Sequence, residues 1–425
     1  MKLYGGYSKK KKKAMQTQTT VGGKQKKEKR RKTALDRVVG ILMTLVILEA
    51  LYCTAVFSDI AFIQKYRNLW IQTAMSTGSH HWLATAFIPG NVVDEVMWEV
   101  AYAKQAQIGV STSWGDGTTA EPEEGETIKD GPAEQFYDLY WEIDPDTMEA
   151  YVEKNPDVLN KGWDQIYINE AGLEDNGTSI RTTAGDQVLA IDVPNQTLVL
   201  RVSGSGYQGV LVIAKDPSKL SVRPAKNLGS YGENAGVIGE RHNGLVAMTA
   251  SGFIDPDGNG NGGTMAGYAM MNGEEHGEHF VWGYKRLEIH NDDRFYITDA
   301  NGTTVDPDTR DAVEFTPALI IDGENLVDEN ADWNGLNPRA CIGQNDRGEI
   351  LMLAIEGRQT HSLGTGVAEC ARILERYNCM QAMNLDGGTS AILWYDGEYI
   401  MRCSNQAIPE GRLLPNAFVY ERTTK

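Results

Sequence analysis

A short segment near the C-terminus combines residue types that can do chemistry. Residues 383–390 read Met-Asn-Leu-Asp-Gly-Gly-Thr-Ser, which sets amide, carboxylate and hydroxyl side chains beside two glycines. Glycines let a backbone approach a ligand closely, and the free N–H groups of such a loop can face an anion or a sugar oxygen. A tight turn before the strand-like residues 391–395 is the plain alternative. The neighbouring segments decide between a site and a turn.

The elements on either side must position this segment. Strand-like residues 349–358 precede it, and apolar residues recur at helical spacing between Gly366 and Tyr377. Glu369 lies near the start of that predicted helix. An apolar strand is predicted downstream at residues 417–420. The segment therefore follows an amphipathic helix and lies among predicted strands.

Four pieces of the sequence, taken in order, resemble one family. They are Pro-Arg-x-x-Ile-Gly at 338–343, the helix with Glu369, Asn-Leu-Asp-Gly-Gly-x-Ser at 384–390, and the late Arg412 and Asn416. This order resembles the phosphodiester glycosidases. That family includes enzymes that remove N-acetylglucosamine from a sugar phosphodiester and bacterial proteins associated with exopolysaccharides. The likeness covers roughly residues 175–422 by inspection.

The resemblance implies a site built around charge. A glycosidic phosphodiester already has a good leaving group, so a cation must hold the phosphate oxygens while a carboxylate activates water or stabilises the oxocarbenium-like carbon. A guanidinium fork matches two phosphate oxygens, although a surface ion pair is the alternative for each arginine. The predicted catalytic residues are Asp386, Glu369 and Arg339. The predicted substrate-binding residues are Asn384, Gly387, Gly388, Ser390, Arg412, Asn416, Ser251, Gly252 and Thr249.

The sequence departs from the family pattern at two places. Thr249 stands where relatives have the Asn of an Asn-x-Gly-Gly-Phe-like turn, and a hydroxyl lacks the two-handed geometry of an amide. Relatives place a proline directly after the late arginine, whereas this chain reads Arg-Leu-Leu-Pro at 412–415. The first departure puts one sugar contact in doubt.

A loop at residues 255–263 alternates oxygen-bearing side chains with glycine, which is the ligand type that a hard cation prefers. It predicts a possible Ca²⁺ site, but it lacks the glutamate at the twelfth position of an EF-hand, and such sequences are also ordinary hairpin turns. A loop that covers the sugar site is a further alternative. The candidate metal ligands are Asp255, Asp257, Asn259 and Asn261.

Charge divides the chain sharply. Residues 1–37 hold fourteen Lys or Arg against Glu28 and Asp36, a net charge of +12, so the total of −18 leaves −30 on residues 38–425. Residues 38–57 are apolar apart from two threonines and Glu49, which is long enough to span a bilayer as a helix. The positive-inside rule then predicts a cytoplasmic tail and a body that faces outward. A cleaved signal peptide is the alternative.

The basic tail and the cysteines argue against nucleic acid and zinc as partners. An acidic body and the adjacent apolar span favour anionic lipid head groups over nucleic acid as the partner of the tail.

The pattern of cysteines argues against a zinc site and favours free thiols. Cys53 lies in the predicted span, and the others lack Cys-x-x-Cys spacing and nearby His pairs. These others are Cys341, Cys370, Cys379 and Cys403.

The rest of the chain predicts an α+β fold with a mixed, mainly antiparallel sheet and few helices. Helical composition is found at 60–107 and 133–160, and strand-like runs lie at 187–193, 197–202 and 207–214. The expected domains are a cytoplasmic tail (1–37), a transmembrane helix (38–57), a helical segment with an acidic linker (58–132) and a glycosidase-like ectodomain (133–425).

Three functions remain open from sequence. The first is a membrane-anchored extracellular hydrolase that removes a sugar from a phosphodiester in a surface glycan or exopolysaccharide. The second is a non-catalytic glycan-binding or assembly protein that keeps the pocket, which the replacement of Asn by Thr249 favours. The third is a surface scaffold in which the Asp-Gly-Gly segment is only a turn.

Overall fold

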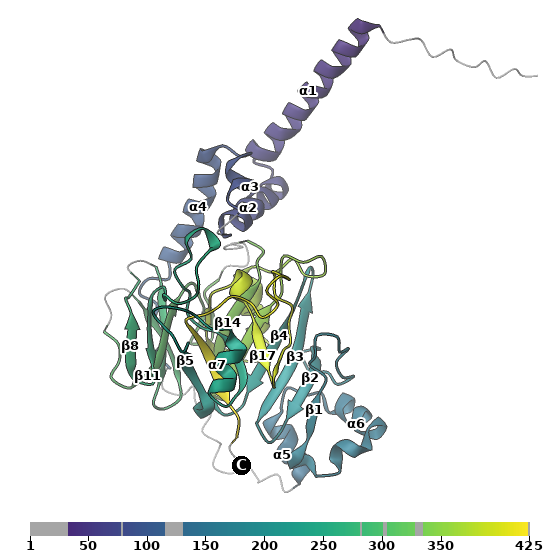
Figure 1. The fold of residues 1–425 in the computed structure, drawn as a ribbon. Helices are drawn as coiled ribbons and strands as arrows, with labels where there is room; N and C mark the ends of the chain where they lie inside the picture. Colours follow the sequence, from purple (N-terminus) through teal and green to yellow (C-terminus); the bar gives the residue numbers. More distant parts are fainter. Residues whose placement is uncertain are drawn as a thin grey trace, which may run out of the picture. The chain divides into compact units, whose positions relative to one another are not determined.

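The computed structural model describes residues 33–77, 80–114, 131–280, 283–300, 304–327 and 335–423 (Figure 1). The chain divides after Thr54 into two compact units, which are described separately. The predicted basic tail, apart from its last residues, lies outside the described residues, as do residues 115–130 of the predicted acidic linker.

Helix α1 (Ala34–Phe57) contains the predicted apolar span and begins four residues earlier. The Asp36 carboxylate accepts the Thr33 N–H at 2.8 Å while the Thr33 hydroxyl accepts the Asp36 N–H at 3.2 Å, a reciprocal cap that starts the helix there. The hydroxyls of Thr44 and Thr54 donate to carbonyls one turn back, both at 2.8 Å, so neither is left unsatisfied. By length and composition α1 is able to cross a membrane, a test that a signal sequence also passes.

Residues 55–425 form a mixed helical and antiparallel-sheet body, as predicted. Its helices are α2 (Ala61–Met75), α3 (Trp82–Thr85), α4 (Gly90–Gln105), α5 (Pro132–Leu139), α6 (Pro145–Lys154), α7 (Ala235–Arg241) and α8 (Val367–Glu375). Short 3-10 turns lie at η1 (Pro156–Leu159), η2 (Trp163–Gln165), η3 (Pro217–Lys219), η4 (Pro256–Gly258) and η5 (Gly388–Ser390). The helical stretches predicted at 60–107 and 133–160 are confirmed.

Three sheets make up the body. The nine-stranded sheet has the order β1 (Tyr167–Asn169), β2 (Gln187–Asp192), β3 (Thr197–Gly204), β4 (Tyr207–Ala214), β15 (Ile350–Ile355), β14 (Arg339–Asn345), β16 (Cys379–Asn384), β12 (Ala318–Ile321) and β13 (Glu324–Asn325). One five-stranded sheet has the order β10 (Phe295–Asp299), β9 (Lys285–His290), β11 (Thr309–Phe315), β7 (Tyr268–Met271) and β8 (Glu274–Gly277). The other has the order β18 (Glu398–Tyr399), β17 (Leu393–Tyr395), β6 (Gly244–Thr249), β19 (Asn416–Glu421) and β5 (Leu220–Pro224).

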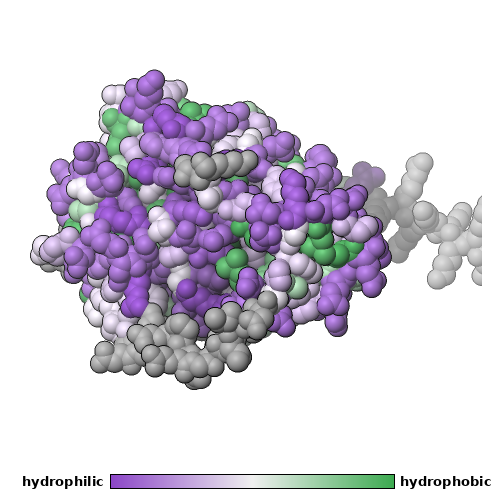
Figure 2. All heavy atoms as spheres, turned by 90° about the horizontal axis from the view of Figure 1, so that it is seen from below, coloured by the Kyte–Doolittle hydropathy of each residue, from purple (hydrophilic) through white to green (hydrophobic). Residues whose placement is uncertain are grey.

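The nine-stranded sheet is buried on both faces. Along β4, Val210 and Val212 face a core shared with the two smaller sheets, whereas Leu211 and Ile213 face a second core that includes α8. In Figure 1, α5 and α6 lie at the end of the large sheet that carries β1 and β2, and β8 and β11 lie on the other side of the body. The face seen in Figure 2 is covered mostly by hydrophilic residues, as expected for a surface in water.

The site lies where three central strands of the large sheet end, which is the edge of the sheet that runs across the strand ends. Because β14 pairs antiparallel with both β15 and β16, the first residues of β14 lie beside the last residues of its two neighbours. Arg339 is opposite Ile355, and Cys341 is opposite Asn384. Three chain segments, residues 337–339, 356–358 and 384–390, therefore meet at this edge.

Helices α2 and α4 are joined to the same edge. The Leu336 N–H donates to the Thr73 hydroxyl at 3.0 Å, and the Asn337 amide donates to the Ser76 hydroxyl at 2.7 Å. Beyond α4, the Gln107 amide exchanges two hydrogen bonds with the backbone of Ala318, at 2.9 and 3.1 Å. The helical segment 61–107 is therefore part of the same folded unit as the sheets.

Candidate active site

A cavity of about 700 Å³ opens at this edge and brings together most of the predicted motif residues. This volume is typical of a small-molecule site. Predicted residues that line the cavity are Arg339, Asn384, Asp386, Gly387, Gly388, Ser390, Arg412 and Asp255. The Asp-Gly-Gly segment therefore forms a cavity wall and not simply a turn.

Asp386 lies in the wall of the cavity with an unusually weak acid group. Burial raises its pKa to about 6, although a hydrogen bond from Ser390 and the charge of Arg412 act in the opposite direction. The nearby carboxylate of Asp255 raises the pKa further. The phenol pKa of Tyr284 is itself raised, first by burial and then by the charge of Asp386. A carboxyl with a pKa near neutrality is suited to exchanging a proton with water or substrate.

Arg339 begins β14 and is almost completely buried. Its Nε donates to the Thr365 carbonyl at 3.0 Å and one Nη donates to the Gly335 carbonyl at 2.7 Å. Burial lowers its pKa. The guanidinium is thus oriented by backbone carbonyls and keeps its positive charge at the cavity wall.

Arg358 lines the same cavity, although no sequence pattern predicted it there. It follows β15 with a left-handed backbone, φ +59°, and one Nη donates to the Asn337 side-chain oxygen at 3.0 Å. A Cβ added to Gly388 would lie 3.4 Å from this guanidinium, so the arginine packs against the glycine of the motif. Its pKa is lowered first by burial and then by the charge of Arg339.

The motif glycine Gly387 is required by a close backbone approach. A Cβ added there would lie 2.7 Å from the Pro338 carbonyl oxygen. The next N–H, of Gly388, donates to that same carbonyl at 3.1 Å. Asn384 anchors the loop from the other side because its amide donates to the Thr316 carbonyl at 2.9 Å. The loop that carries Asp386 is thus tied directly to the residue before Arg339.

Arg412 reaches the cavity but its guanidinium is already engaged. It forms a two-pronged ion pair with Asp255, at 2.8 and 3.1 Å, and donates to the Gly260 carbonyl at 2.7 Å. It also lies over the ring of Phe253, 4.9 Å from the centroid. Arg412 therefore holds the 255–260 loop against the cavity, and its predicted contact with the substrate stays a prediction.

Two of the four candidate calcium ligands are engaged within the loop. The Asp255 carboxylate accepts from Arg412 and from the Gly260 N–H, and the Asn261 side chain bonds to the Ser230 carbonyl and the Gly263 N–H. These bonds close the loop. The Asp257 side chain lies outside the described part of the chain, and Asn259 is the C-cap of η4. Among the described residues, no cluster of three His, Cys, Asp or Glu forms a metal site.

Glu369 is not among the residues that line the cavity. It lies on α8, accepts the Tyr207 hydroxyl at 2.6 Å and pairs with Arg372 at 2.7 Å. These partners give it a structural environment on the helix surface. Its position in the helix could be predicted from periodicity, but periodicity does not tell which face meets the cavity.

Of the early turn of the family pattern, residues 249–253, only Phe253 lines the cavity. Thr249 ends β6, is fully buried and has a hydroxyl without a hydrogen-bond partner among the described residues. Asn416 is likewise buried, and its amide donates to the Ser251 hydroxyl at 3.0 Å and accepts the Ser251 N–H at 2.9 Å. A Cβ on Gly252 would lie 3.2 Å from the Phe315 ring, a residue that does line the cavity. This turn supports the cavity from behind.

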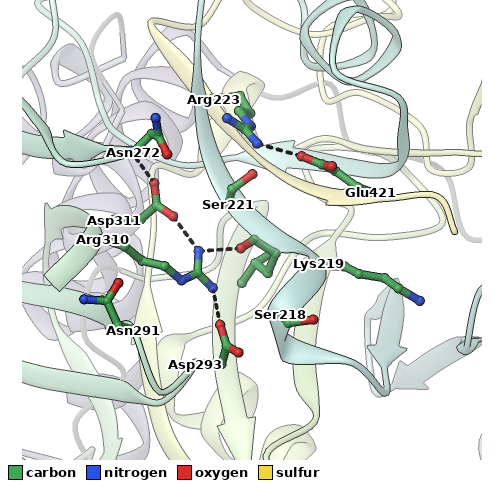
Figure 3. A pocket seen from close by; sticks show the side chains of 11 residues that line it. Ser218, Lys219, Ser221, Arg223, Asn272, Asn291, Asp293, Arg310, Asp311 and Glu421 are labelled. Atoms are coloured by element: carbon green, nitrogen blue, oxygen red, sulfur yellow. Dashed lines mark hydrogen bonds and ion pairs between the residues drawn. The ribbon is translucent and has the colours of Figure 1, made fainter. Parts of the chain in front are cut away.

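A second polar cavity, of about 330 Å³, lies elsewhere in the body (Figure 3). Arg310 on β11 pairs with Asp311 and Asp293 at 2.6 and 2.9 Å and donates to the Leu220 carbonyl. Arg223 pairs across the sheet with Glu421 at 2.6 Å. The arginines of this cavity are thus neutralised by their neighbours and join β5, β11 and β19, which favours a structural role.

The five cysteines are free thiols, as predicted, and those of the body are buried. Burial raises the pKa of Cys379 and Cys403, which leaves both as inert thiols at neutral pH.

Comparison with known proteins places this site in a family. Residues 243–421 match the phosphodiester glycosidase family model, a shorter stretch than the 175–422 expected from inspection. The SPbeta prophage-derived uncharacterized protein YomE of Bacillus subtilis is 28% identical over 99 residues, which cover 23% of this chain and 15% of that protein. The chain therefore spans only a small part of the length of this relative.

Two solved structures resemble the body more loosely. The auto-inhibited catalytic domain of zebrafish N-acetylglucosamine-1-phosphodiester alpha-N-acetylglucosaminidase is 18% identical, with a TM-score of 0.45 over 53% of this chain and 83% of that chain. A hypothetical protein from Synechocystis is 14% identical, with a TM-score of 0.39 over 56% of this chain and 65% of that chain. The family match thus covers residues 243–421, which hold Arg339, Asp386 and Arg412 of the cavity.

Proposed function

We propose that the protein is a membrane-anchored hydrolase that removes a sugar from a glycosidic phosphodiester in a surface glycan or exopolysaccharide. The observation that carries the proposal is one cavity that holds both a carboxyl with a pKa of about 6 and the guanidinium groups of Arg339 and Arg358. Acyl or sugar chemistry on a neutral substrate would not need this concentration of positive charge.

In the proposed reaction the two arginines hold the phosphate oxygens. The bond between the anomeric carbon and the phosphate oxygen breaks, and the electron pair leaves with the phosphate. Asp386, in its ionised form, stabilises the positive charge that develops on the sugar or accepts a proton from the attacking water. Asp255 is the other carboxylate lining the cavity among the described residues, and its ion pair with Arg412 leaves Asp386 as the acting group.

The rival function, glycan binding without turnover, loses its main support. It rested on Thr249, which is buried behind the cavity and is not part of its lining. Thr249 itself contributes no group to the cavity lining.

Membrane anchoring is supported by two features of the N-terminal region. Helix α1 is long and apolar enough to span a bilayer. Helices α2 to α4 expose aromatic side chains of the kind enriched at membrane interfaces, such as Phe62, Trp70 and Trp98, which are 71%, 52% and 71% exposed.

The direct test is hydrolysis by the full chain in an uncharged detergent, against a panel of sugar-1-phosphodiesters. Release of free sugar should occur equally with and without a chelator, because Asp255 and Asn261 are already engaged in closing the loop. If the folded protein releases sugar from none of the phosphodiesters, the hydrolase proposal is wrong.

A further inference from the structure

The cavity carries a charge opposite to that of the body around it. Its charged lining consists of four cations and two carboxylates, a net charge of +2 with both carboxylates ionised: Lys104, Arg339, Arg358 and Arg412 against Asp255 and Asp386. The chain beyond residue 37 carries a net −30. A local excess of positive charge in an acidic protein indicates an anionic ligand.

Three of the lining cations, Lys104, Arg339 and Arg358, carry the excess of positive charge; the part of the lining that they form is called the cationic wall. Arg412 and Asp255 neutralise each other in their ion pair. Lys104 and Arg358 form no ion pair among the residues that the structure describes, and the charge of Arg339 lowers the pKa of both, after burial as the larger cause. Arg339 on β14 thus lies close enough to Lys104 on α4, and to Arg358 after β15, for the like charges to repel.

Lys104 is held at this wall by the fold and is not a freely moving surface side chain. It lies in the last turn of α4. Three residues later the Gln107 amide bonds to Ala318, and the Lys285 ammonium donates to the carbonyls of Gln107 and Val110, both at 2.6 Å. The end of α4 is therefore fixed to the body. Lys104 also lies outside the part of the chain that matches the family.

Partly buried like charges destabilise a protein unless an anion compensates them. A simple phosphodiester brings one negative charge and would leave the cavity at a net +1. Two joined phosphoryl groups, each with one negative charge, would neutralise the net +2. The number of cations therefore matches a diphosphate better than a single phosphodiester.

We propose that the leaving group of the substrate carries two phosphoryl groups, so that the substrate is a glycosyl diphosphate ester, and that Lys104 binds the second phosphoryl group. This inference rests on the proposed function. In the balanced step, water adds its oxygen to the anomeric carbon, the sugar–oxygen bond breaks, and the diphosphate ester leaves with the electron pair. The proton of the water passes to Asp386 and then to solvent.

The test uses calorimetry to measure how tightly the full chain, in an uncharged detergent, binds inorganic pyrophosphate and inorganic phosphate. The wild-type protein should bind pyrophosphate about tenfold or more tightly than phosphate. Lys104→Met should weaken pyrophosphate binding about tenfold and phosphate binding less than twofold, and Lys104→Arg should restore most of the loss.

The matched control is Lys154→Met, which removes an exposed lysine on α6. Residues 1–37 carry fourteen cations that can also bind pyrophosphate. The deciding quantity is therefore the difference in pyrophosphate affinity between Lys104→Met and Lys154→Met. Equal pyrophosphate affinity in both, or equal wild-type affinity for phosphate and pyrophosphate, would overturn the inference. Thermal melting identifies a variant that fails to fold, in which case the comparison of Lys104→Arg with Lys104→Gln decides.

Turnover separates this inference from the proposed function. Nucleotide-diphosphate sugars and short isoprenyl-diphosphate sugars form the two substrate arms, and they distinguish a soluble donor from a lipid-linked one. Hydrolysis of sugar diphosphate esters that Lys104→Met leaves unchanged, or hydrolysis of simple phosphodiesters alone, would keep the hydrolase and refute the diphosphate site. Pyrophosphate binding that depends on Lys104, without hydrolysis of any sugar ester, would keep the site and refute the hydrolase.

Discussion

At the scale of single residues, the chemistry depends on the ionisation of Asp386. Its pKa in the folded protein, about 6, lies above the ordinary value of 3.8, so folding disfavours the charged form. The cost is absent below about pH 4, grows as the pH rises toward 6 and is complete above that value. The residue that we propose for catalysis therefore destabilises the fold at neutral pH, a known feature of active sites.

Asp386→Asn should abolish hydrolysis because Asn has nearly the same shape but cannot carry the negative charge. The same change should raise stability at pH 7.5, by about 1–3 kcal/mol, because it removes the cost of ionising a buried carboxyl. Wild-type kcat/KM should fall as the pH drops through about 6, where Asp386 gains its proton.

Melting curves of wild type and Asp386→Asn at pH 7.5 and pH 4 check the sign of the stability change, since the gain in stability should vanish at the lower pH. Wild-type turnover in the Asn variant would place the catalytic carboxylate elsewhere. An equal stability gain at both pH values would show that Asp386 is not the buried acid described above.

Arg339→Lys keeps one charge but loses the fork that contacts both Thr365 and Gly335. We expect kcat/KM to fall by a factor that corresponds to about 1–3 kcal/mol of transition-state stabilisation. Stability should fall by about 1–2 kcal/mol for the lost hydrogen bonds. Kinetics corrected for the folded fraction separate the two effects. An unchanged kcat/KM in the folded protein would leave Arg339 with a structural role alone.

At the scale of elements, the site depends on three strand ends that one antiparallel register brings together. The local signals for two of these elements are strong, because β15 is an apolar run and the Asp-Gly-Gly loop has an unusual composition, whereas β16 includes Gln381 and Asn384. Sequence patterns could therefore predict the helix at 366–377, realised as α8, and the loop that carries Asp386. They could not predict which far segments meet this loop.

Lys104 and Tyr284 show the physical reason for that limit. Lys104 ends an ordinary amphipathic helix and Tyr284 precedes an ordinary strand, so neither pattern distinguishes a cavity residue from a surface residue. Only the tertiary packing of α4 and β9 places them in the lining. Glu369 is the converse case, since its helix was predicted correctly while its side chain faces Arg372 and Tyr207.

Gly387→Ala tests the contact between two of these elements. The added Cβ would lie 2.7 Å from the Pro338 carbonyl, so the loop must move and the hydrogen bond from Gly388 must weaken. We expect a loss of about 1–3 kcal/mol in stability and at least about a tenfold loss in kcat/KM. The matched control is Gly90→Ala at the start of α4, where an added Cβ meets nothing within 4 Å. Equal behaviour of the two variants would contradict the close approach.

At the scale of the whole molecule, the chain joins a strongly basic tail, an apolar helix and an acidic body. A substrate with two phosphoryl groups would be repelled by residues 38–425, which carry a net charge of −30, unless a local field guides it. The cavity supplies that field over a short range, since charges are screened within about 8 Å at physiological ionic strength. Placement of the cations inside the cavity therefore favours anions that fit it over anions in general.

The orientation of the chain in the membrane is the last prediction. The excess of Lys and Arg lies before the apolar span that begins at Val38, so the positive-inside rule leaves residues 1–37 in the cytoplasm and sends the body outside. Protease added to intact cells should therefore remove the body and leave a short membrane-bound fragment with the basic tail. A tag on the N-terminus should become accessible only after lysis. Release of an intact body into the medium without protease would instead indicate that α1 is a cleaved signal peptide. A body that resists external protease but is digested after lysis would show the reverse topology and place the cavity on the cytoplasmic side.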